Sequence, residues 1–188
     1  VLNAYRDALF DFRDPRWRIE HAQVIAKEDF DLFNSKIIPS VQPTHATSDM
    51  YWLKERIGRI RAKYAYAYKE LLGKSQIIAF GTDFPVEDIS PIMTYYSAVA
   101  RKDINGYPDE GFQIENSISR GDALIAMTRH GAYANFEEDE KGSIEVGKFA
   151  DFIILDNDLI TSAENRIPLT NIVATFINGE LVFNRRFN

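Results

Sequence analysis

The clearest buried strand is predicted at Gln76-Ile77-Ile78-Ala79-Phe80-Gly81, which runs directly into Thr82-Asp83. Its central residues are apolar at successive positions, as in parallel strands that are covered on both faces. Two earlier strands are predicted at 16–21 and 36–43, the second with a proline near each end. The sequence therefore predicts three strands that end in His21, the segment around Gln42, and Asp83.

Helix-type spacing separates these strands. One apolar stripe is Phe30, Phe33 and Ile37; another is Tyr64, Tyr68 and Leu71, although the tyrosine–alanine alternation over 64–68 also fits a strand. After the third strand, Ser90-Pro91 and Ser119-x-x-Asp122 are typical helix starts, the latter beginning a helix that runs to Ala134. Alternation of strand and helix predicts an α/β fold with a parallel sheet.

The C-terminal part has a different pattern. A strand is predicted at 150–155, and Asn178-Gly179 lies between two further strands as a hairpin turn. We expect residues 142–156 and 172–184 to form one antiparallel unit, separate from the parallel strands.

Composition excludes several classes of protein. The 188 residues carry 28 acidic and 22 basic side chains, a net charge of −6. The composition therefore lacks the excess of basic residues that is typical of nucleic-acid-binding proteins. No stretch approaches the ~20 apolar residues of a membrane span. The absence of cysteine excludes disulfides, thiolate nucleophiles and cysteine-based zinc sites.

A histidine and an aspartate stand at the ends of predicted strands, where a functional site is expected. His21 ends the first predicted strand and Asp83 follows the third. Side chains at the carboxyl ends of parallel strands converge on one face, and a His–Asp combination suits a cation such as Zn²⁺. The structural alternatives are a histidine that merely packs at the sheet rim and an aspartate that caps the next helix.

The other histidines are less distinctive. His45 follows the second strand and either contacts substrate or faces solvent, whereas His130, inside the late helix, is expected to be structural. No phosphate-binding glycine loop is present, and the Gly-x-Ser-x-Gly elbow of a small α/β esterase is missing.

Three motifs carry a family resemblance: Arg18-Ile-Glu-His-Ala-Gln23, Ser40-Val-Gln-Pro-Thr-His-Ala-Thr-Ser-Asp49 and Phe80-Gly-Thr-Asp-Phe-Pro-Val86. In this order they resemble successive strand-end motifs of the amidohydrolase superfamily, most closely amidohydrolase family 3, the YtcJ-like metal-dependent hydrolases. The resemblance implies a (β/α)8 barrel of the TIM type with a small β-sandwich. Residues 1–141 would supply strands six to eight of the barrel with its C-terminal helices, and residues 142–188 the C-terminal part of the sandwich.

The same resemblance implies the roles of particular residues. His21 matches the metal ligand after strand six, and Asp83 matches the aspartate that contacts the metal or its water and shuttles the proton. His45 and Gln42 match positions in the pocket and are expected to bind substrate. The implied cofactor is a divalent metal, zinc by preference, and the implied reaction is metal-assisted hydrolysis of a non-peptide C–N bond in an amide or cyclic amide.

The chain lacks several metal-site residues that the family pattern includes. No His-x-His pair is present, and the groups expected after strands four and five are missing. We therefore expect the C-terminal part of such an enzyme, with an incomplete metal site and no activity alone. The alternative is a non-catalytic truncated paralogue or interaction module. Expected partners are a small-molecule substrate and either a second copy of the chain or the missing N-terminal half. The cytoplasm is favoured, although a signal peptide would lie in the missing N-terminus.

Overall fold

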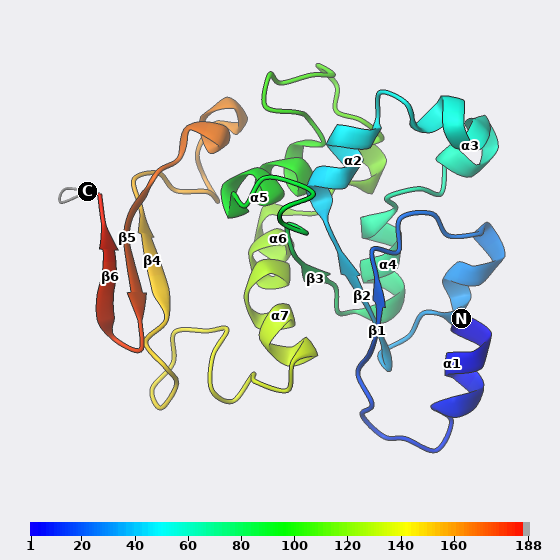
Figure 1. Ribbon diagram of the computed structural model, residues 1–188, viewed down its shortest axis with the longest axis horizontal. Coiled ribbons are helices and arrows are strands. Elements are labelled where there is room, and N and C mark those ends of the chain that lie inside the picture. The colour runs from blue at the N-terminus through cyan, green and yellow to red at the C-terminus, as the bar shows by residue number, and fades with distance from the viewer. Residues whose placement is uncertain (186–188) are drawn as a thin grey trace.

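The computed structural model describes residues 1–185 and contains two separate sheets (Figure 1). The first is a parallel sheet in the order β1-β2-β3, and the second is antiparallel in the order β4-β5-β6. The fold is therefore mixed α/β, as predicted. No helix in this part of the chain is long and apolar enough to cross a membrane.

The parallel sheet and the elements around it come first in the chain. Strand β2 is central, and its Ile37, Ile38 and Val41 are completely buried, each side chain contributing about 1.5–3 kcal/mol through removal of apolar surface from water. Within residues 1–185, β1 and β3 each pair only with β2 and so form the two sheet edges. The elements as far as β3 are α1 (Leu2–Ala8), β1 (Trp17–Glu20), the 3₁₀ helix η1 (Lys27–Leu32), β2 (Ile37–Val41), α2 (Pro43–Asp49), α3 (Leu53–Ala62), α4 (Tyr68–Ser75) and β3 (Ala79–Phe80).

Helices separate the two sheets. In Figure 1, α5, α6 and α7 lie between the parallel sheet and the antiparallel one, with α6 and α7 packed against β3. The predicted caps are confirmed, since the Ser90 and Ser119 hydroxyls accept the N–H groups of Met93 and Asp122. These elements are α5 (Pro91–Ala100), the 3₁₀ helix η2 (Ile114–Asn116), α6 (Arg120–Met127), α7 (Arg129–Ala134), β4 (Phe152–Leu155), the 3₁₀ helix η3 (Glu164–Leu169), β5 (Ile172–Ile177) and β6 (Glu180–Asn184).

The predicted hairpin is confirmed. Asn178 and Gly179 adopt φ values of 50° and 79° between β5 and β6, as a turn with two left-handed residues requires. The antiparallel unit is smaller than expected, because residues 142–151 form no strand and strand β4 begins only at Phe152.

Three predicted elements were wrong in extent. The stripe over 30–37 is not one helix: η1 ends at Leu32, and Ile37 pairs with Trp17 in the sheet. Helix α4 begins only at Tyr68, since the N–H of Tyr66 is taken by the carbonyl of Gln23. The third strand shortens to Ala79–Phe80 because Gln76 ends α4 in the left-handed conformation.

The single helix predicted between Ser119 and Ala134 is two helices in the structure. Helix α6 ends at Met127 and α7 starts at Arg129, with the hydroxyl of Thr128 donating back to the carbonyl of Leu124. Such a local side-chain bond competes with continuation of the helix.

Candidate functional site

His21 lies immediately after β1, where the backbone turns sharply. Its φ of 66° is left-handed, while its N–H still bonds to the carbonyl of Ser40 in the neighbouring strand at 2.7 Å. Imidazole Nδ1 donates to the amide oxygen Oε1 of Gln42 at 2.9 Å. With the single proton of a neutral ring on Nδ1, Nε2 keeps its lone pair.

His45 lies in the first turn of α2, which Pro43 opens directly after β2. The side chain is buried, with 5% of the residue exposed, so the solvent-facing alternative was wrong. Two carboxylates flank the ring: Oε1 of Glu87 lies 2.8 Å from Nδ1, and Oδ2 of Asp83 lies 3.3 Å from Nε2.

Asp83 follows β3 in a turn in which its own carbonyl accepts the N–H of Val86 at 2.7 Å. Its φ of 59° is left-handed, and the next helix is capped by Ser90 instead. The alternative role of Asp83 as a helix cap was therefore wrong, and its carboxylate turns toward the histidines.

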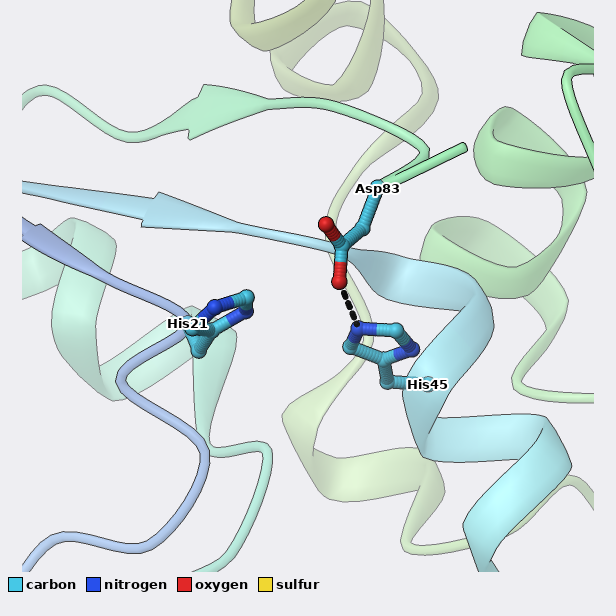
Figure 2. Close-up of side chains that lie close together, drawn as sticks. All are labelled: His21, His45 and Asp83. Carbon is cyan, nitrogen blue, oxygen red and sulfur yellow. Dashed lines mark ion pairs between the residues drawn. The ribbon is translucent and has the colours of Figure 1, made fainter. Parts of the chain in front are cut away.

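These three side chains converge at the carboxyl ends of the parallel strands. Figure 2 shows His21, His45 and Asp83 directed toward one another from three successive segments of the chain. One ligand atom from each lies within 4.8 Å of the others, which confirms the predicted approach of His21 and Asp83, with His45 beside them. The group lines a pocket of about 260 Å³ together with Gln23, Asp49, Val86 and Glu87.

The donor set fits a divalent cation. Both imidazoles have Nδ1 within hydrogen-bond distance of an acceptor outside the cluster, and the Asp83 carboxylate has only lone pairs to offer. With the proton of each neutral ring on Nδ1, the two Nε2 atoms and the carboxylate are three acceptors, a set that suits a positive ion. Imidazole nitrogen and carboxylate oxygen are ordinary zinc ligands.

Residues that the sequence did not single out support this cluster. Glu87, one position beyond the motif around Asp83, also accepts the hydroxyl of Ser48 at 2.5 Å. The hydroxyl of Tyr66 donates to the carboxylate of Asp49, and burial together with this bond raises the pKa of Tyr66. Both contacts join segments distant in sequence: Ser48 and Asp49 end the second motif and Glu87 follows the third, but no local pattern pairs them with each other or with Tyr66.

The remaining predicted residues lie outside the pocket lining. Gln42 is buried, with 6% exposed, and its amide holds His21, so its contact with substrate stays a prediction. His130 lies in α7 with Nδ1 3.2 Å from the carbonyl of Ile78, and burial lowers its pKa. That backbone contact agrees with the structural role expected for His130.

Comparison with known proteins places this site in a family. The model of a family described as "Amidohydrolase family" matches residues 1–183. The chain belongs to the amidohydrolase family. Its similarity to the YtcJ-like branch extends to curated proteins: it is 30% identical over 169 residues to Putative amidohydrolase YtcJ of Bacillus subtilis, covering 89% of this chain and 32% of that protein.

Two further relatives extend the comparison. Protein LONG AFTER FAR-RED 3 of Arabidopsis thaliana is 35% identical over 173 residues, which cover 91% of this chain and 29% of that protein. An uncharacterized metal-dependent hydrolase from Pyrococcus furiosus superposes with a TM-score of 0.70 at 30% identity, over 85% of this chain and 31% of that structure. The amidohydrolase chain thus spans about a third of the length of each of these three proteins.

Proposed function

We propose that this chain is the C-terminal part of a metal-dependent hydrolase that cleaves a non-peptide C–N bond in an amide or cyclic amide. Membership of the amidohydrolase family and similarity to a metal-dependent hydrolase support the reaction class. Strands β1, β2 and β3 would be strands six, seven and eight of a (β/α)8 barrel. Of the predicted segment 142–188, residues 142–185 would belong to the small β-sandwich, and residues 186–188 lie outside the described residues.

The observation that carries the proposal is the convergence of His21, His45 and Asp83 within 4.8 Å at the carboxyl ends of parallel strands. Barrel enzymes of this class place their active sites at that end. His21 and His45 would hold the cation through Nε2, and Asp83 through a carboxylate oxygen. Zinc is the metal we propose, since it accepts this set of ligands. A bound divalent cation supplies polarisation of the scissile carbonyl and a lower pKa for attacking water.

Asp83 would carry the proton. Its carboxylate is partly exposed in the pocket, with 35% of the side chain accessible, so it can reach a water molecule on the substrate side. It would accept the proton of the attacking water and deliver it to the leaving nitrogen. Gln42 would act by keeping the ring of His21 in place.

The test compares D83N with D88N in the complete protein. Asp88 lies on the same loop but is exposed, and its carboxylate accepts the N–H of Ser90. Hydrolysis of an amide or cyclic amide panel should fall by about 10²-fold or more in D83N, the range expected for loss of a general acid–base, and remain in D88N. Full activity in D83N would refute the catalytic role. Absence of hydrolysis in the metal-loaded wild type would favour a non-catalytic module.

A further inference from the structure

Glu87 connects the loop after β3 to helix α2 beside the candidate metal site. It lies four positions after Asp83, and only 17% of its side chain is exposed. One oxygen, Oε1, accepts from both Nδ1 of His45 at 2.8 Å and the hydroxyl of Ser48 at 2.5 Å. The carboxylate is therefore held in place by two donors on one face of α2.

Two carboxylates compete for the single proton of a neutral His45 ring. In one tautomer Nδ1–H donates to Glu87 and Nε2 keeps its lone pair. In the other tautomer, Nε2–H donates to Oδ2 of Asp83. These two atoms then bond to each other and are not available to a cation in the pocket. The contact with Glu87 is shorter by 0.5 Å, from 3.3 to 2.8 Å, and Glu87 is the less exposed of the two acids.

We propose that Glu87 is a positioning residue: its contact with Nδ1 of His45 selects the tautomer that keeps Nε2 and the Asp83 carboxylate available to a cation. The inference rests on the proposed function for what occupies the pocket, but the choice of tautomer is a property of the chain itself. A second histidine shows the same arrangement, since Nδ1 of His21 donates to Gln42. Partners of this kind orient ligating histidines in metal sites.

Nitrogen NMR of the metal-free chain tests the proposal directly. The chain has three histidines, so ¹⁵N-histidine labelling gives few signals, and the H45Q and H130Q variants assign them. The spectra are recorded at about pH 9, well above the pKa of about 6.5 of a free histidine side chain. In the wild type, Nε2 of His45 should show the shift of an unprotonated nitrogen.

The variants separate the role of Glu87 from a general effect on folding. E87A should move Nε2 of His45 to the shift of a protonated nitrogen, because Asp83 is then its remaining acceptor. E87Q keeps an acceptor oxygen at the same position and should restore the wild-type pattern. An Nε2–H signal in the wild type, which needs no variant to fold, overturns the proposal; so does an unchanged tautomer in folded E87A.

A zinc titration connects the tautomer to the site. E87A should bind zinc about 10–100-fold more weakly than the wild type, the usual cost of losing such a partner, with most of the affinity recovered in E87Q. Equal affinity in E87A overturns the positioning role. If the wild type does not bind zinc, the proposed cation site of this chain fails, while the NMR result still decides whether Glu87 selects the tautomer.

Discussion

His45 and Asp83 meet at the carboxyl end of the parallel sheet with Nε2 of the imidazole 3.3 Å from Oδ2 of the carboxylate. In the proposed tautomer, in which Nδ1–H of His45 donates to Glu87, both of these atoms bring lone pairs to the contact. Nε2 of His21 is free in the same way, since its Nδ1 donates to Gln42. The cluster is thus arranged around a positive charge that its own side chains do not provide.

The buried guanidinium of Arg101 is expected to be a main determinant of stability. Nε donates to the carbonyl of Phe112 at 2.9 Å and Nη1 to that of Tyr66 at 3.3 Å, and the residue is fully buried. R101M would remove the donor to the buried carbonyl of Phe112, at about 1–3 kcal/mol, whereas the carbonyl of Tyr66 keeps the N–H of Tyr68 at 2.9 Å, so the free energy of unfolding should fall by about 1–3 kcal/mol. Urea denaturation measures this, with the exposed Arg59 as control in R59M. Equal stability of R101M and R59M would contradict the assignment.

Two glycines give a matched test of backbone conformation. Gly179 has φ = 79° in the turn between β5 and β6, and the nearest atom that a new Cβ would meet is 3.8 Å away. The cost of G179A is therefore conformational, and we expect a loss of about 1 kcal/mol in the free energy of unfolding. Gly121 lies inside α6 with nothing within 4 Å of such a Cβ. G121A should leave stability unchanged or raise it by up to about 1 kcal/mol. Thermal unfolding that ranks the two variants in the opposite order would exclude this explanation.

The open edge of β1 predicts self-association. Within residues 1–185 this strand pairs only with β2, and Trp17 on it is 43% exposed. An unpaired edge is a template for another strand, and a charge placed there discourages pairing. Sedimentation should show dimers or larger species in the wild type and several-fold weaker association in W17K. The matched variant I60K changes an exposed apolar residue of helix α3, which belongs to neither sheet, and should leave association intact. A monomeric wild type, or weakening only in I60K, would contradict this prediction.

The sequence predicts the site well where local signals place it at strand ends. His21 and Asp83 were identified because each follows a predicted strand, and parallel strands bring their carboxyl ends together. Local chemistry also predicted the Ser90 and Ser119 caps and the turn at Asn178. Each of these features depends on residues a few positions apart.

The features that escaped prediction depend on contacts across the fold. The bond of Glu87 to His45 joins residues from two segments, and that of Tyr66 to Asp49 joins a loop to α2. The helix expected to include Tyr64 starts later because the preceding backbone pairs with Gln23 and Val24. The spacing of apolar residues carries no information about tertiary hydrogen bonds that compete with the helix for backbone groups.

Zinc binding by the chelator-treated chain tests the central claim most directly. Calorimetric titration should detect zinc binding to the wild type, and H21A, H45A and D83N should each bind at least about tenfold more weakly, because each removes a ligand atom from the cluster. H130Q, which changes the histidine outside the cluster, should retain wild-type affinity once its folding is verified by circular dichroism. A wild-type chain that does not bind zinc, or affinity that falls as much in H130Q as in H21A and H45A, would contradict the account.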